Sequence, residues 1–142
     1  MHRIARLILA FAFAAGLAAP VAAEVAAGDR AAMQALVDGQ IDAFRRDDGG
    51  AAYSYASPPI QNLYPTVDLF MGMVRQSFQP VYRPQAYTFG PLIETAAGPK
   101  LRVFVTGPDG APYIAEYSFQ RQPDGSWKIN GCTIVKDTSP TI

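Results

Sequence analysis

The chain has 142 residues with 12 basic and 12 acidic side chains, so its formal net charge at pH 7 is zero. The basic residues form no patch or stripe typical of nucleic-acid-binding proteins, and we expect no nucleic-acid partner. His2 is the only histidine and Cys132 the only cysteine, which excludes histidine-based catalytic units and an intramolecular disulfide from the rest of the chain.

Residues 1–23 have the pattern of a secretory signal peptide. Two arginines precede an apolar stretch over residues 7–19, and small residues occupy the cleavage positions at 21–23. The alternative is an uncleaved membrane anchor, although the stretch is short for a span of roughly 20 residues. We therefore expect a periplasmic or secreted protein without membrane association after cleavage. Removing 23 residues leaves 119, enough for one domain.

The first half of this mature chain has helical periodicity. Over residues 30–47 apolar side chains recur at three- and four-residue steps, which predicts a helix capped by Asp29 and ended by Gly49 and Gly50. Gly39 in its interior costs about 1 kcal/mol and indicates either a close approach or a weak point. The apolar stripe consists of Met33, Leu36, Val37, Ile41 and Phe44.

Prolines divide the following segment. We expect a short helix within residues 51–57, stopped by Pro58 and Pro59, and a further helix over residues 66–77, capped by Thr66 and ended by Pro80.

Beyond Pro80 the period changes from helical to alternating. Residues 81–89 are expected to form a bent or edge strand, followed by a turn at Gly90 and Pro91 and a short strand over residues 92–95. Three further strands are separated by two Pro-Asp-Gly turns and form a meander of two consecutive hairpins. Residues 137–142 are expected to be a flexible tail.

Helices followed by an antiparallel meander are typical of an α+β domain, here residues 24–136. The helices are expected to pack on one face of a curved sheet, which produces a cone with a pocket at its mouth. Within the sheet, alternation predicts that Glu116 points away from the core.

Six segments form a distinctive set: residues 40–48 (QIDAFRRDD), 55–58 (YASP), 73–74 (MV), 80–84 (PVYRP), 89–90 (FG) and 124–132 (DGSWKINGC). Together they resemble the bacterial family described as domain of unknown function 4864. The general layout is also similar to the cone-shaped nuclear-transport-factor-2-like superfamily, whose members include ketosteroid isomerase and many ligand-binding domains. The first resemblance implies no established activity, and the second implies a fold and carries no function by itself.

The candidate binding residues are polar or aromatic side chains expected near the pocket. Gln40 lies within the apolar stripe, where its amide either bonds to the backbone of the sheet or anchors a ligand. Five aromatic residues either line a pocket or belong to the core: Tyr53, Tyr55, Tyr64, Tyr82 and Trp127. Arg83 either contacts an anionic ligand at the rim or is solvated.

Catalytic and metal-binding groups are scarce. Proton transfer of the isomerase or dehydratase type needs a carboxylate in an apolar pocket, and we assign no catalytic residue because the acids lie on polar faces or in turns. Asp47 and Asp48 are expected to cap a turn or helix rather than to bind calcium. We expect no metal and no cofactor.

We therefore expect a non-catalytic domain that binds a small, partly apolar molecule or associates with a second copy as a homodimer. Phe104 and Ile114 on the outer sheet face favour the second form. An isomerase- or dehydratase-like enzyme and an assembly partner without a ligand remain alternatives.

Overall fold

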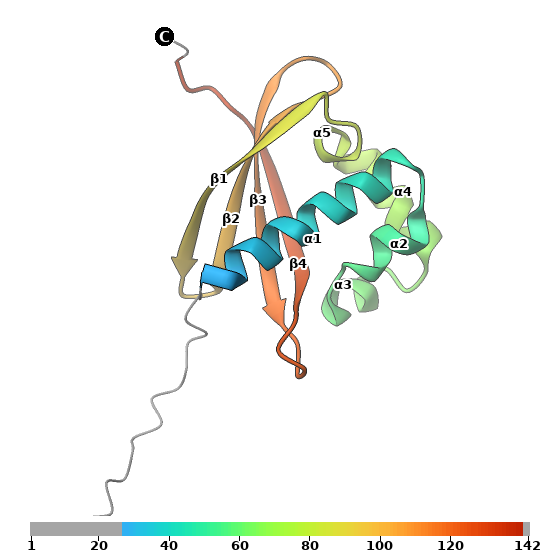
Figure 1. Ribbon diagram of the computed structural model, residues 1–142. Coiled ribbons are helices and arrows are strands. Elements are labelled where there is room, and N and C mark those ends of the chain that lie inside the picture. The colour runs from blue at the N-terminus through green and yellow to red at the C-terminus, as the bar shows by residue number, and fades with distance from the viewer. Residues whose placement is uncertain (1–26, 141–142) are drawn as a thin grey trace, which may run out of the picture.

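The computed structural model describes residues 27–140, where five helices precede a four-stranded antiparallel sheet (Figure 1). This order confirms the predicted α+β fold class. The expected signal peptide, residues 1–23, lies outside the described residues. Residues 137–140, at the start of the expected tail, contain neither helix nor strand.

Helix α1, Ala27–Arg45, crosses the sheet (Figure 1). Met33, Val37 and Ile41 are fully buried and pack against the strands, as the apolar stripe predicts. A methyl group added to Gly39 would lie 2.5 Å from the hydroxyl oxygen of Tyr55. This glycine therefore permits the close approach that the sequence indicated.

Four short helices follow at the C-terminal end of α1 (Figure 1). They are α2 Gly49–Ser54, α3 Pro58–Leu63, α4 Val67–Ser77 and α5 Gln79–Tyr82. The expectation that Gly49, Pro58 and Pro80 only end helices was wrong, because each lies in the first turn of a new helix. Proline is compatible with a first turn, where its missing N–H group would have no helical partner. Asp48 caps α2 by accepting a hydrogen bond from Ala51 N at 3.0 Å, as expected for one of the paired aspartates.

The sheet consists of four strands in sequence order. They are β1 Ala86–Thr95, β2 Gly98–Thr106, β3 Pro112–Arg121 and β4 Trp127–Lys136. Three hairpins connect them, one more than predicted, because Gly90 and Pro91 do not reverse the chain. Strand β1 continues through them with a bulge between Phe89 and Leu92. Such an irregularity on an edge strand accommodates a proline, which has no N–H to donate.

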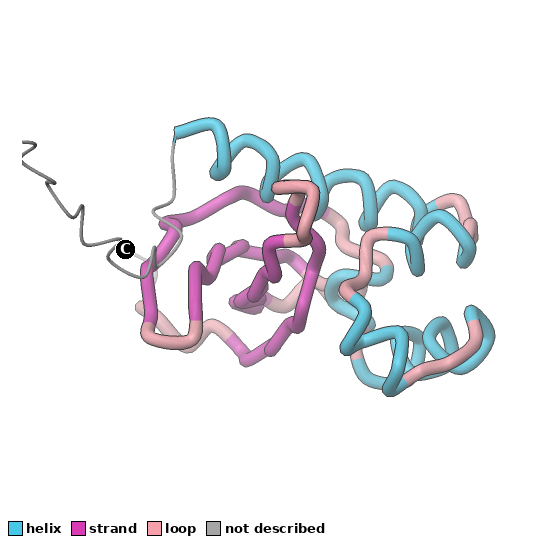
Figure 2. The backbone as a smooth tube through the Cα atoms, turned by 90° about the horizontal axis from the view of Figure 1, so that it is seen from below, coloured by secondary structure: helices cyan, strands magenta, loops and turns pink. Residues whose placement is uncertain are grey.

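The predicted alternation of the central strands is confirmed. The buried inner positions are Leu101, Val103, Val105, Ala115, Tyr117 and Phe119. Glu116 points to the opposite face, where its two oxygens lie 3.6 Å from Lys100 and 3.6 Å from Arg102. Figure 2 shows the curvature of the sheet and the course of α1 along it.

The interior contains two apolar clusters. One lies between α1 and the sheet and includes Met33, Val37 and Tyr117. The other joins the C-terminal end of α1 to the short helices and includes Phe44 and Phe70. The short helices therefore have a core of their own beside the sheet.

A short extended segment attaches the helical layer to strand β4. Ala56 forms a parallel bridge with Ile129, whose N–H donates to Tyr55 O at 2.9 Å and whose carbonyl accepts from Ser57 N at 2.8 Å. The buried Ser57 hydroxyl donates to Asn130 Oδ1 at 2.7 Å. These bonds fix the distance between the short helices and β4, and so shape the space between them.

Candidate ligand cavity

A cavity of about 190 Å³ lies where the two apolar clusters meet. Helices α1, α3 and α4 form one side of it, and strands β3 and β4 form the other. The lining residues are Gln40, Phe44, Ala56, Ile60, Leu63, Tyr64, Phe70, Met73, Val74, Phe78, Val81, Tyr117, Ile129, Gly131 and Cys132. None of them is an aspartate, glutamate, lysine or arginine, so the wall carries no formal charge.

Gln40 contributes an amide to this apolar wall. Its side chain is 5% exposed, and its Nε2 donates to the Ala52 carbonyl of α2 at 3.2 Å. The expected structural bond therefore exists, although its acceptor belongs to a helix and not to the sheet. Because only the nitrogen can donate to a carbonyl, this bond also fixes the amide orientation. Within residues 27–140, the Gln40 carbonyl oxygen accepts no hydrogen bond and can receive one from a ligand.

Tyr117 and Cys132 add two further polar groups to the wall. Each lies on the inner face, and the two residues are direct partners across β3 and β4. The Tyr117 hydroxyl is buried and forms no hydrogen bond of regular geometry with any described residue. Burial raises its pKa well above the ordinary value, and the neighbouring Cys132 thiol adds to the shift. Burial also raises the pKa of the Cys132 thiol to about 12, so both groups stay protonated and neutral at physiological pH.

The lining residues differ strongly in their exposure to solvent. Gln40 is 5% exposed and Tyr117 is 1% exposed, whereas Leu63 at the end of α3 is 72% exposed. Ile60 and Met73 of the same wall are half-buried. We place the floor at Gln40 and Tyr117 and the mouth near Leu63.

Tyr55 lies beside the cavity and is not among its lining residues. Its ring packs on α1 at Gly39, which has no side chain to oppose it. Its backbone carbonyl holds β4 through Ile129. Tyr55 therefore positions the wall of the cavity.

Tyr82 and Arg83 also lie outside the lining, at the C-terminal end of α1. Tyr82 Oη donates to Asp47 Oδ1 at 2.7 Å, and Arg83 Nη2 lies 2.6 Å from the same oxygen. Arg83 also donates to the Phe44 carbonyl, and its guanidinium lies 4.0 Å from the centre of the Tyr82 ring. The hydrogen bonds that Asp47 accepts from Tyr82 and from Arg83 lower the pKa of Asp47, and the bond from Tyr82 has the larger effect. In the structure both predicted binding residues join α1 to α5.

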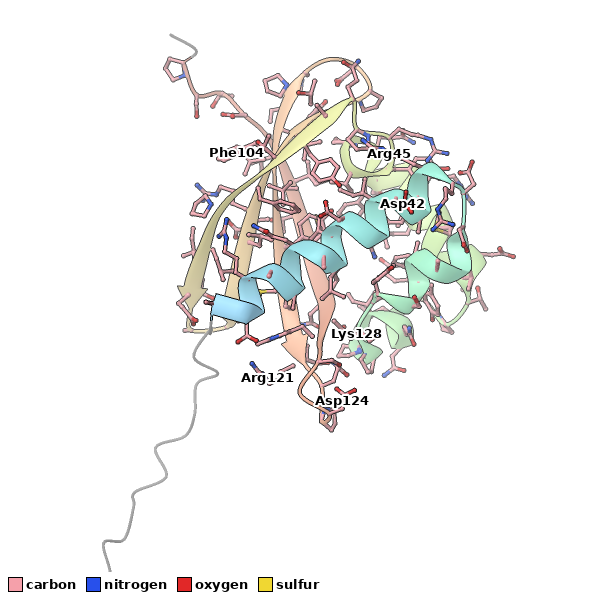
Figure 3. All side chains as sticks on the ribbon, viewed as in Figure 1. Asp42, Arg45, Phe104, Arg121, Asp124 and Lys128 are labelled. Carbon is pink, nitrogen blue, oxygen red and sulfur yellow. The ribbon has the colours of Figure 1, made fainter. Side chains whose placement is uncertain are left out.

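Trp127, the fifth predicted residue, lies at the opposite end of α1 and does not line the cavity. Its Nε1 donates to Asp29 Oδ1 at 3.1 Å, while Arg121 contacts Asp29 Oδ2 at 3.0 Å and covers the indole ring. Figure 3 shows Arg121 at this end of the sheet. Asp29, expected to cap a helix starting at residue 30, lies instead in the first turn of α1, which begins at Ala27. Its carboxylate fastens that turn to the sheet.

Carboxylates are distant from the cavity wall or exposed. Asp42 lies on the surface of α1 (Figure 3) and pairs with Arg46 at 2.9 Å. The Asp29 and Glu116 side chains are 18% and 29% exposed, and both form ion pairs. Among the described residues no group of three or more metal-binding side chains gathers in one place.

Sequence reasoning selected Gln40 as a binding residue and named Tyr64 among the possible pocket aromatics, and both line the cavity, but it missed Tyr117 and Cys132. The signal for Tyr117 was its inward position on a strand, which also fits an ordinary core residue. Its pairing with Cys132 follows from the hairpin register, which places the two side chains on the same face.

The comparisons with known proteins identify one family. A family model described as "Domain of unknown function (DUF4864)" matches residues 26–142. No curated protein and no solved structure matches the chain. In the described part of the chain, none of the helices combines the length and the apolarity required to cross a membrane.

Proposed function

We propose that the domain binds a small, mostly apolar molecule in this cavity without catalysing a reaction. The chain belongs to the DUF4864 family, whose description names no activity, so the proposal is based on the cavity. The observation that carries this proposal is an uncharged, largely apolar cavity with its few polar groups at the buried end. Ligand sites in proteins have this composition, in which apolar walls bury the ligand and a few polar groups orient it.

The volume limits the size of the ligand. Drug-sized ligands occupy pockets of about 300–1,000 Å³, whereas an apolar cavity of about 150 Å³ holds benzene. At about 190 Å³ this cavity fits a single ring or a short chain. A larger molecule would bind by inserting one end past Leu63.

The alternative of an isomerase- or dehydratase-like enzyme receives less support. That chemistry needs a carboxylate in the pocket whose pKa is raised by an apolar environment. The cavity lining contains no aspartate or glutamate. An assembly partner with a filled interior is also less favoured, because the space between the two clusters is open.

We also propose that the domain works outside the cytoplasm, on the basis of the signal-peptide pattern in residues 1–23. The exported protein should then begin at Glu24, and mass spectrometry of the mature chain would reveal any other start. The resemblance to the nuclear-transport-factor-2-like superfamily is compatible with a ligand cavity between helices and a curved sheet. It remains a proposal at the level of fold.

Self-association through the outer sheet face is the second candidate function. Phe104, Ile114 and Val135 are neighbours across β2, β3 and β4, and Phe104 and Val135 are 39% and 59% exposed. An exposed apolar row of this kind, next to charged Arg102 and Glu116, is compatible with a homodimer. Binding of a ligand in the cavity does not depend on it.

Toluene is a suitable first probe for the cavity because it is a single apolar ring. It should raise the melting temperature of the purified mature protein, since a ligand that binds only the folded state stabilises it. Met73→Trp replaces a half-buried side chain at the rim by a bulky aromatic ring, and it should abolish the increase in melting temperature. Leu69→Trp is the matched control, because Leu69 lies one turn earlier on α4, is 56% exposed and does not line the cavity. Equal toluene shifts in wild type and in folded Met73→Trp would refute the proposed site.

A further inference from the structure

We propose that the natural ligand of the cavity is a neutral molecule with a small apolar body and one hydroxyl group, bound with the hydroxyl at the floor beside Gln40 and Tyr117. This inference rests on the proposed function and specifies the ligand class for the same site. Three features carry it: the absence of charge from the wall, the hydrogen-bonding groups at the floor, and the gradient of exposure.

The uncharged wall selects against ions. No aspartate, glutamate, lysine or arginine is among the lining residues, and two weakly acidic groups of the wall, Tyr117 and Cys132, are held neutral by burial. A carboxylate or an ammonium group at the floor would lose its hydration without gaining a counter-charge. Neutral compounds do not have this cost, so the cavity should bind neutral ligands in preference to charged ones.

The floor offers one acceptor and one donor. The Gln40 carbonyl oxygen accepts no hydrogen bond within the described residues, since the amide nitrogen alone is used, by Ala52 O. The Tyr117 hydroxyl forms no hydrogen bond of regular geometry there; it lies beside the Cys132 thiol, is protonated and can donate. A hydroxyl group can donate to the first and accept from the second through a single oxygen atom. A ketone could satisfy only Tyr117, and a purely apolar ligand neither.

A buried hydroxyl without a hydrogen bond of regular geometry is unusual in a folded protein and calls for an explanation. Leaving such a group without a hydrogen bond destabilises the empty protein, and a ligand that supplies the missing acceptor removes this penalty. Phenylalanine at position 117 would avoid this penalty without a ligand. The hydroxyl of Tyr117 is therefore explained if it recognises a ligand.

The gradient of exposure orients the ligand. Leu63 is 72% exposed and Met73 is half-buried, whereas Gln40 and Tyr117 are 5% and 1% exposed. An apolar body placed toward Leu63 and a hydroxyl placed toward Tyr117 match both ends of the wall. The reverse orientation would leave both floor groups without partners.

Four probes of nearly equal shape test this inference: toluene, benzyl alcohol, benzoate and benzylammonium. They differ only in the group attached to one ring, and calorimetric titration or protein NMR shifts give their affinities. Benzyl alcohol should bind, and both ions should bind at least about 100-fold more weakly, because each would be a buried charge without a partner. Tyr117→Phe should reduce the ratio of benzyl alcohol to toluene affinity about 3- to 10-fold, the effect of one lost hydrogen bond.

Tyr113→Phe is the matched control. Tyr113 lies on the same strand and face, but its hydroxyl donates to Asp109 and it does not line the cavity. This variant should leave the affinity ratio unchanged. Tyr117→Phe is expected to fold, because it removes only a hydroxyl that forms no hydrogen bond of regular geometry among residues 27–140.

The outcomes separate this inference from the proposed function. If toluene and benzyl alcohol both bind and Tyr117→Phe leaves their ratio unchanged, the hydroxyl recognition is wrong while the cavity proposal stands. If benzoate or benzylammonium binds as tightly as benzyl alcohol, the selection of neutral ligands is wrong. If none of the four probes binds the folded wild type, the proposed function fails and this inference fails with it.

Discussion

Gly39 and Tyr55 show how a single residue sets the packing of α1. The Tyr55 ring occupies the space in which any other residue at position 39 would place its Cβ, 2.5 Å from the hydroxyl oxygen. A glycine within a helix is destabilising, so its presence at position 39 requires an explanation. The structure shows that Tyr55 packs against this position. That partner lies in a segment which also pairs with β4.

We expect Gly39→Ala to destabilise the protein by about 1–2 kcal/mol, because the overpacking cost of about 1–3 kcal/mol exceeds the gain of about 1 kcal/mol in helix propensity. Urea denaturation of both proteins measures the difference. Gly72→Ala is the control, since Gly72 lies within α4 and an added Cβ meets nothing within 4 Å. It should stabilise by up to about 1 kcal/mol. A Gly39→Ala variant as stable as Gly72→Ala would contradict this account.

Among the predicted binding residues, the sequence identified side chains that matter but not what they contact. Trp127 and Tyr82 were expected either to line a pocket or to belong to the core; both are buried, and neither lines the cavity. Their partners, Asp29 and Asp47, are 98 and 35 residues away in the chain. Periodicity gives the face on which a side chain lies, whereas such a partner depends on how distant elements pack.

At the level of elements, the end of α1 is joined to α5 through Asp47. This residue has a positive φ of 52° and accepts hydrogen bonds from both Tyr82 and Arg83. Asparagine also tolerates the left-handed backbone conformation, so Asp47→Asn keeps the turn and removes the charge. The variant therefore isolates the electrostatic part of the junction.

The junction predicts an acid dependence of stability. Hydrogen bonds from Tyr82 and then Arg83 lower the folded-state pKa of Asp47 below its ordinary value of 3.8, so on acidification the unfolded chain takes up this proton first. The stabilisation is therefore present above pH 3.8 and is lost as the pH falls through the lower folded-state pKa of Asp47. We expect wild type to be more stable than Asp47→Asn at neutral pH and to lose this advantage on titration to about pH 2. Urea denaturation across this range measures it, and a difference that is constant with pH would exclude the mechanism.

The elements were predictable where one signal dominated. Alternation in residues 101–106 and 113–120 gave the buried face of the sheet, and the helical stripe gave the buried face of α1. Prolines gave ambiguous information, because the same residue ends one helix and fits the first turn of another, as at Pro58 and Pro80. Two of the four short helices were missed for this reason.

The cavity was the least predictable feature. Gln40 could be selected because a polar residue within an apolar stripe is conspicuous. The open space arises because α3 and α4 form a core of their own beside the sheet, and the segment at Ala56 fixes their distance from β4. No periodicity in the sequence encodes that distance. Tyr117 therefore had the pattern of an ordinary core residue.

On the scale of the whole molecule, the two faces of the sheet differ in what covers them. The inner face is covered by α1, whereas the outer face keeps Phe104 and Val135 exposed. Phe104, labelled in Figure 3, pairs with Ile114 on the next strand, and Ile114 pairs with Val135. Two copies stacked through this face would bury the row twice. A homodimer would thus leave the cavity on the opposite side of each sheet accessible.

We expect sedimentation velocity of the mature protein to show a concentration-dependent dimer, which Val135→Lys should weaken by more than about tenfold because it places a charge in the apolar row of each copy. Leu69→Lys is the matched control: Leu69 is 56% exposed against 59% for Val135, but it lies on α4, away from the sheet face. This variant should dimerise like wild type, and circular dichroism checks that both variants fold. A wild-type protein that stays monomeric at all concentrations, or equal weakening by the two lysines, would refute the dimer. Toluene binding by such a monomer would assign the function to the cavity alone, since the cavity lining contains none of the three side chains of the row.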